Sequence, residues 1–230
     1  MIIVPAALAA ALIVAPGCDV TDATLTWGFK ESFRAYIDGS IANGEWTTAN
    51  GATYETPSFS WANGSGRYDP ATGTGSIAFT GSVRFVGHDG LLDTTIENPT
   101  LMLDGDSGRL LLDVTGVTMD GVMVDTDDVP FVLLPSVEVV GDDAVRTLDA
   151  ETTLTEDGAT AFPNYPAGEA FDPVSVSMNV GKTCDTVTVD EGYGPQAPQF
   201  PLAAFLTGLG VLAVVAAAAV FLFLTRRRRA

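Results

Sequence analysis

Side chains that could do chemistry are scarce in this 230-residue sequence, which narrows its possible functions. It contains one histidine, His88, and two cysteines, Cys18 and Cys184, against 29 acidic residues and 5 tyrosines. A structural zinc site needs four such ligands, so that site and a histidine-rich metal enzyme are both disfavoured. Serine, histidine and aspartate all occur, but no Gly-x-Ser-x-Gly elbow or comparable motif prepares a nucleophile. We therefore do not expect an enzyme.

The two cysteines lie near the two ends of the segment that we expect to fold. Cysteines of an exported protein are free to oxidise, and the ends of a domain often lie close together. A Cys18–Cys184 disulfide is therefore predicted, and closing so long a loop is worth about 4–5 kcal/mol if it acts through chain entropy. The alternative is lipidation of Cys18 after cleavage of a signal, although Ala15-Pro16-Gly17 is a poor lipobox.

Charge is distributed very unevenly along the chain. Residues 19–200 hold all 29 acidic residues but only 7 of the 11 basic ones, so this segment has a formal charge of −22. Such a surface repels a phosphate backbone, which excludes nucleic acid as a partner. Because 47% of the residues are hydrophobic, the chain can also form a core, unlike a disordered acidic tail.

The two apolar ends of the chain indicate where the protein resides. Residues 202–224 carry no charge and are long enough to cross a bilayer core of about 30 Å as a helix. Four arginines follow at 226–229, so we expect a single-pass transmembrane helix over 202–225 with a cytoplasmic tail at 226–230. The domain before it would then face outward from the cell membrane. Residues 1–17 resemble a secretory signal, and the Pro/Gly-rich stretch 191–201 predicts an extended linker.

Residues 18–190 have the pattern of one mainly β domain. Apolar and polar residues alternate in short runs, and glycine-rich turns separate the runs. Asp104-Gly-Asp-Ser-Gly108 separates two such runs, which predicts a hairpin. Many short strands with regular turns favour an antiparallel β-sandwich-like fold. The alternating apolar positions are Ile77, Phe79, Val83, Phe85, Leu101, Leu103, Leu110, Leu112, Val114, Val174, Val176, Met178 and Val180.

One segment, 27–37, has helical rather than strand periodicity. Phe29, Phe33, Tyr36 and Ile37 fall on one face. Lys30, Glu31 and Arg34 share the opposite face. The pattern predicts a short amphipathic helix near the N-terminus, docked on the sheets. A tyrosine on an apolar face needs a hydrogen-bond partner for its hydroxyl group.

Three sequence blocks resemble the HtaA family, which comprises haem-binding domains on the envelope of corynebacteria and related actinobacteria. They are LTWGFKESFRAYI (25–37), YDPATGTGSIAFTGSVRFVGHDGLLDTTIENPTLML (68–103) and FPNYPAGEAFDPVSVSM (162–178), in the family's order. The resemblance implies an exported β-rich domain that binds ferric haem b. It also implies that haem is taken from host haemoproteins and handed to a membrane-anchored binding protein of a transporter.

The resemblance assigns haem-site roles to Tyr36, His88 and Tyr165. Tyr36 matches the axial ligand of the ferric iron, His88 matches the histidine beside it, and Tyr165 matches a further family tyrosine. The chemistry fits, because a phenolate is a hard anionic ligand and tyrosine is an established axial ligand of haem. A histidine hydrogen-bonded to the phenolic oxygen would orient it. Phe29 and Phe33 could form an apolar wall for the porphyrin or belong to the core.

The predicted function is therefore a membrane-anchored, extracytoplasmic haem-binding module. One alternative is a non-haem β-sandwich used for cell-surface adhesion or cell-wall contact. A second is a calcium-dependent carbohydrate binder, which would require acidic loops to converge. The candidate loops contain Asp104 and Asp106, Asp125 with Asp127 and Asp128, and Asp142 with Asp143.

Overall fold

The computed structural model describes residues 17–117, 121–142 and 144–185, and these form a predominantly β structure. It has two short α-helices, α1 (Glu31–Asp38) and α2 (Glu156–Ala161), and one 3-10 turn, η1 (His88–Gly90). The strands are β1 (Gly17–Trp27), β2 (Glu45–Ala49), β3 (Ala52–Glu55), β4 (Ser58–Asp69), β5 (Thr74–Ala78), β6 (Ser82–Gly87), β7 (Leu92–Asp104), β8 (Ser107–Val117), β9 (Met123–Leu134), β10 (Val140–Gly141), β11 (Val145–Leu154) and β12 (Ala170–Asp185).

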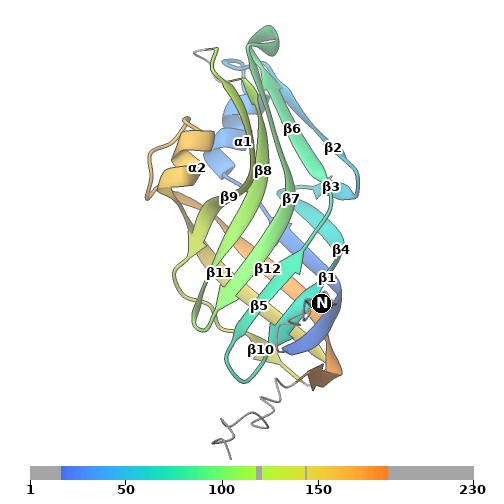
Figure 1. Cartoon of the computed structure of the whole chain (residues 1–230). Helices are drawn as coiled ribbons and strands as arrows, with labels where there is room; N and C mark the ends of the chain where they lie inside the picture. Colours follow the sequence, from blue (N-terminus) through green and yellow to red (C-terminus); the bar gives the residue numbers. More distant parts are fainter. Residues whose placement is uncertain (1–16, 118–120, 143, 186–230) are drawn as a thin grey trace, which may run out of the picture. The chain divides into compact units, whose positions relative to one another are not determined.

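The strands form one antiparallel sheet that folds back on itself. Its order is β2-β6-β7-β5-β4-β1-β12-β11-β9-β8, and β8 also pairs with β7, so the path returns to β7. Figure 1 shows β5, β7, β8 and β9 in front of a second layer that contains β4, β1, β12 and β11. The apolar side chains of both layers meet between them. This arrangement confirms the prediction of a mainly antiparallel β domain.

The alternating apolar positions are buried as predicted. All thirteen belong to the hydrophobic core, because every second residue of a strand points to the same face. The predicted hairpin is β7–β8, which closes with Asp104 opposite Ser107. The core also contains a dense cluster of aromatic rings around Phe29. The centroid of the Phe29 ring lies 5.1–5.8 Å from the ring centroids of six neighbours: Trp27, Phe33, Phe85, Phe131, Phe162 and Phe171.

The amphipathic helix is present, but it is shorter than the predicted segment 27–37. Trp27 is the last residue of β1, and α1 begins only at Glu31. Between them Phe29 has a φ of 65°, which is outside the helical range and turns the chain from the strand into the helix. Phe29 and Phe33 are fully buried, so they belong to the core and do not form a wall for a ligand.

Arg34, on the polar face of the predicted helix, is buried. Only 8% of Arg34 is exposed, because α1 packs its second side against β12, where the guanidinium group meets Asp172. Helical periodicity predicted which residues share a face. It did not predict that Arg34 is buried against Asp172 while Glu31 on the same face stays exposed.

A disulfide joins Cys18 to Cys184 as predicted. The two cysteines are opposite each other in the antiparallel pair β1–β12, so the first and last strands are neighbours. The bond uses the Cys18 thiol that the lipidation alternative would require.

Several predicted segments lie outside the described residues. They are the signal-like segment apart from Gly17, the linker 191–201, the transmembrane helix 202–225 and the basic tail 226–230. Within the part of the chain that the structure describes, no helix has both the length and the apolarity needed to cross a membrane.

Candidate functional site

Tyr36 occupies the last turn of α1, at the end of the β domain where the helix leads into β2. Its side chain is half-buried, with the ring centroid 6.2 Å from that of Phe33. Phe33 is itself buried in the aromatic core, which places the Tyr36 ring on a rigid apolar support. The phenol therefore combines a fixed ring with partial access to solvent.

His88 lies in η1, the tight turn that joins β6 to β7. His88 and Asp89 have φ angles of 54° and 56°, a region that residues other than glycine rarely adopt. The backbone N–H of His88 donates a hydrogen bond of 2.7 Å to the carbonyl oxygen of Ala42, in the connection between α1 and β2. That bond holds the turn beside the end of α1. Strained backbone of this kind often occurs at functional sites.

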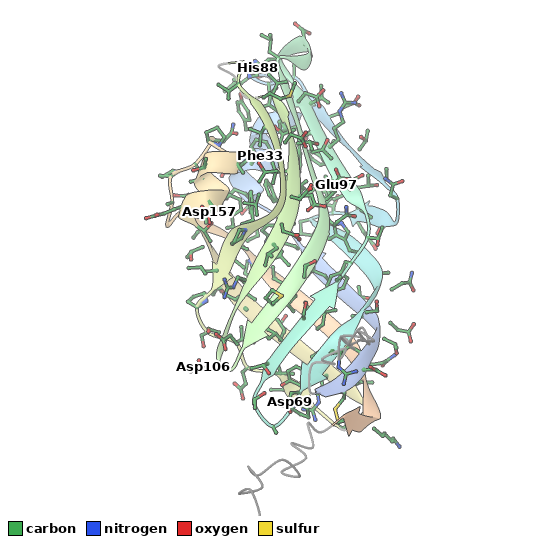
Figure 2. The ribbon with its side chains drawn as sticks, in the orientation of Figure 1. Phe33, Asp69, His88, Glu97, Asp106 and Asp157 are labelled. Atoms are coloured by element: carbon green, nitrogen blue, oxygen red, sulfur yellow. A yellow bond between two sulfur atoms is a disulfide. The ribbon has the colours of Figure 1, made fainter. Side chains whose placement is uncertain are left out.

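The fold brings Tyr36 and His88 into direct contact. The Tyr36 hydroxyl group and His88 Nε2 form a hydrogen bond across 52 residues of sequence. Both side chains are half-buried, and their ring centroids are 5.7 Å apart. Figure 2 shows His88 at the end of the strands opposite to Asp69 and Asp106. The arrangement couples an ionisable oxygen to a group that can accept or donate a proton.

Tyr165 does not join this pair. It lies between α2 and β12, and its hydroxyl group is 3.0 Å from Ser32 Oγ. Ser32 is one helical turn before Tyr36, so the two positions share a face of α1. The Tyr165 ring packs against Phe162 and Phe171, at centroid distances of 6.1 and 5.7 Å. Tyr165 thus reaches the same helix face from its other end.

Sequence reasoning missed four apolar residues at the His88 end that are exposed to solvent. Ile41 is 74% exposed and Leu91 is 68% exposed, and they lie in the two connections joined by the His88–Ala42 hydrogen bond. Val122 and Met123 are 59% and 72% exposed, at the start of β9. Met123 pairs with Val117 of β8, which pairs with β7 directly after η1. Their only sequence signal is apolar character outside the alternating pattern.

The acidic loops do not converge in the described structure. Asp104 and Asp106 lie at the β7–β8 turn, whereas Asp125, Asp127 and Asp128 lie along β9. Among the described residues, no group of three or more histidine, cysteine or acidic side chains could hold a metal ion. The calcium-dependent alternative therefore gains no support from these residues.

A family model of the HtaA domain (Htaa) matches residues 22–177. The chain belongs to the HtaA family. The C-terminal domain of HtaA from Corynebacterium glutamicum is 37% identical, with a TM-score of 0.67, over 73% of this chain and 100% of that domain. The N-terminal domain of the same HtaA is 30% identical, with a TM-score of 0.60, over 70% of this chain and 98% of that domain.

The fold extends to a second Corynebacterium glutamicum protein. Heme binding protein HtaB has a TM-score of 0.61 over 73% of this chain and 98% of its own, and at 22% identity this likeness shows the fold alone. No curated protein sequence matches the chain. The HtaA match includes α1, η1 and the segment that carries Tyr165, whereas both cysteines lie outside it.

Proposed function

We propose that this HtaA-family protein binds ferric haem b through Tyr36 and passes it on for uptake of haem and iron. The hydrogen bond between Tyr36 and His88 is the observation that carries the proposal, because it joins a potential anionic ligand to a proton acceptor. Membership of the HtaA family supports it. Binding and release, rather than catalysis, are the proposed activity.

The residues at this end suit a ferric porphyrin. Ferric haem would supply a hard cationic centre that favours an anionic oxygen ligand. Tyr36 offers that oxygen from a half-buried side chain whose ring rests on Phe33. Ile41, Leu91 and Met123 supply exposed apolar surface at the same end. A large flat apolar ring would cover such surface.

His88 could accept the proton of the Tyr36 hydroxyl group. A tyrosine in water keeps its proton up to about pH 10, so a phenolate at neutral pH needs help from its surroundings. With Nε2 unprotonated, the Tyr36 hydroxyl donates to it. If the proton moves to Nε2, the resulting N–H donates back to the phenolate oxygen. His88 would thus hold the proton and orient the ligand atom.

Tyr165 would contact a different part of the ligand. Its hydroxyl group pairs with Ser32 Oγ at 3.0 Å, one helical turn from Tyr36. Two neighbouring hydroxyl groups are suited to the polar edge of a porphyrin, and they stand apart from the Tyr36–His88 pair. We therefore assign Tyr165 to ligand binding and not to coordination of the iron.

The cellular setting that we propose follows from the ends of the chain. The uncharged stretch 202–224 and the arginines at 226–229 support a single-pass anchor in the lipid bilayer with the domain on the extracytoplasmic side. Donors would be host haemoproteins, and the recipient would be a membrane-anchored haem-binding protein of a transporter. A disulfide that joins β1 to β12 is in keeping with an oxidising compartment.

Titration of the full-length chain with hemin in a mild detergent tests this function. We expect a Soret band with ferric-tyrosinate charge-transfer absorption, and we expect Tyr36→Phe to abolish the charge-transfer feature. His88→Ala should weaken binding by about 10–100-fold, as loss of a partner to a metal ligand usually does. Tyr54→Phe is the matched control, because Tyr54 is also half-buried and packs on Trp46 and Phe59.

Equal bound-haem spectra for the unchanged chain and Tyr36→Phe would contradict Tyr36 as the iron ligand. If hemin gives only the spectrum that it has in detergent alone, haem binding itself is contradicted. That second result would favour the non-haem adhesion or cell-wall-contact alternative.

A further inference from the structure

The helix that carries Tyr36 does not cap its own beginning. Lys30 occupies the N-cap position, and its side chain makes no capping hydrogen bond. Asp172, from β12, supplies the missing acceptor, since its Oδ1 accepts a 2.9 Å hydrogen bond from the backbone N–H of Glu31. A helix of only eight residues depends on such tertiary contacts, because it is too short to be stable alone.

The second oxygen of Asp172 holds α1 one turn further on. Arg34 donates from Nη2 to Asp172 Oδ2 at 2.8 Å, and the two side chains are only 10% and 22% exposed. At about 100° per residue, Arg34 and Tyr36 point to opposite sides of the helix. The carboxylate therefore fixes the back of α1 while Tyr36 faces His88.

Asp172 is itself held firmly. Its backbone N–H donates to the carbonyl oxygen of Phe29 at 2.9 Å. Its own carbonyl oxygen accepts from Trp27 Nε1 at 2.7 Å and from Thr152 Oγ1 at 3.0 Å. Gly28 leaves room for the carboxylate, because a Cβ at that position would lie 2.2 Å from Asp172 Oδ2. The residue that holds the start of α1 therefore belongs to a rigid part of the sheet.

We propose that Asp172 is a positioning residue of the site. Its carboxylate sets the start and the rotation of α1, and through them the contact of the Tyr36 hydroxyl group with His88 Nε2. The inference rests on the proposed function, in which Tyr36 is the ligand of haem iron. It concerns the ligand-free geometry as well, so it can be tested without hemin.

Nuclear magnetic resonance of His88 provides that test. His88 is the only histidine of the chain, so selective ¹⁵N-histidine labelling of the full-length protein gives one imidazole to follow. Tyr36→Phe supplies the reference for a broken contact. At one fixed pH, Asp172→Ala should move the Nε2 chemical shift toward that reference. Asp172→Asn keeps an oxygen acceptor for the backbone N–H of Glu31. Its Nε2 chemical shift should therefore lie between that of Asp172→Ala and that of the unchanged protein.

Asp149→Ala is the matched control, because Asp149 is a carboxylate of the neighbouring strand β11 that accepts a hydrogen bond from Ser175 of β12. It should leave the His88 signal unchanged. A purely structural role for Asp172 would lower the unfolding midpoint while the His88 shift stayed in place, and that result would overturn the inference.

Hemin binding gives the second readout. Asp172→Ala should weaken hemin binding by about tenfold and shift the charge-transfer band, with partial recovery in Asp172→Asn. If the unchanged chain binds no hemin but the His88 shifts still follow Asp172, the proposed function fails and the positioning role stands. If hemin binds through Tyr36 but Asp172→Ala changes neither readout, the positioning role fails alone.

Discussion

The two ends of the β domain are held together in different ways. At the disulfide end, Cys18 of β1 pairs with both Cys184 of β12 and Tyr68 of β4, so backbone ladders and a covalent bond act together. At the site end, two helices and the turn η1 attach to the sheet chiefly through side chains and single loop hydrogen bonds. In Figure 2, Asp69 marks the disulfide end of the β domain and His88 marks the site end.

The difference indicates that the disulfide end chiefly stabilises the fold, whereas the site end presents the side chains of the candidate site. A closed backbone ladder specifies one geometry but offers few free polar groups. Loops and short helices can present Tyr36 and His88 to a ligand, and they depend on contacts that are individually weak. We therefore expect that the free energy of unfolding can be changed separately from the geometry of the Tyr36–His88 pair.

Removal of the disulfide should cause the largest change. Cys18→Ser with Cys184→Ser should lower the free energy of unfolding by about 4–5 kcal/mol, because the bond closes a loop between residues 166 apart in sequence. Denaturant titration with and without a reductant measures this loss. Below the denaturation transition the hemin spectrum should be unchanged. An altered charge-transfer band would show that the two ends are coupled.

A methyl group at Gly28 should have an intermediate effect, confined to the site end. The added Cβ would lie 2.2 Å from Asp172 Oδ2, so the carboxylate must leave Arg34 and Glu31. We expect Gly28→Ala to cost about 1–3 kcal/mol of stability, as overpacking does, and to weaken hemin binding. Thermal unfolding and hemin titration measure the two effects.

Gly181→Ala, at the disulfide end, is the control for Gly28→Ala. Its Cβ would lie 3.3 Å from the carbonyl oxygen of Asp19, a close contact that a shift of a few tenths of an ångström relieves. It should leave hemin binding unchanged. Equal effects of the two substitutions on hemin affinity would contradict the separation of the two ends.

The smallest effect is expected at the ion pair that spans the strands flanking η1. Arg84 on β6 donates two hydrogen bonds to Asp93 on β7, and the hydrogen bond from Arg84 lowers the pKa of Asp93 below its usual range. Because the folded-state pKa is depressed, any stabilisation is present above the unfolded-state pKa of about 3.9 and is lost as the pH falls through the folded-state value.

Asp93→Asn should accordingly lower the unfolding midpoint slightly at pH 7, and the difference should shrink as the pH falls below the unfolded-state pKa of about 3.9. Unfolding curves across this pH range, at low and high salt, measure the difference, which salt should reduce because Arg84 is 54% exposed. A difference that does not shrink as the pH falls would show that Asp93 acts through packing. Hemin binding should hardly change, since His88 is held by Ala42 as well.

Much of the fold could be predicted from local pattern. Alternation identified the apolar positions of β5–β8 and β12, because a strand places every second side chain on one face. The turn residues between Leu103 and Leu110 gave the β7–β8 hairpin. The cysteines could be paired because they lie near the two ends of the one predicted domain. The start of α1 was placed too early, since the φ of 65° at Phe29 depends on tertiary packing.

The site could be predicted in part. Tyr36 and His88 were named through their family blocks, and the structure brings them together. Tyr165 was named as well, but its contact with Ser32 was not foreseen. Asp172 and the exposed residues around η1 were missed, because an aspartate in a strand and an isolated leucine after a turn have no distinctive sequence pattern.

The sequence by itself determined the strands, the amphipathic character of the helix and the acidic charge, because each depends on residue type and short spacing. Only the tertiary structure decided which side chains meet. Tyr36 reaches His88 over 52 residues, and Arg34 reaches Asp172 over 138. Such contacts depend on how the sheet closes, since strand pairing and chain direction set the positions of residues that are distant in sequence. The chemistry of the individual residues can thus be inferred from the sequence, whereas the tertiary structure determines which of them meet at one site.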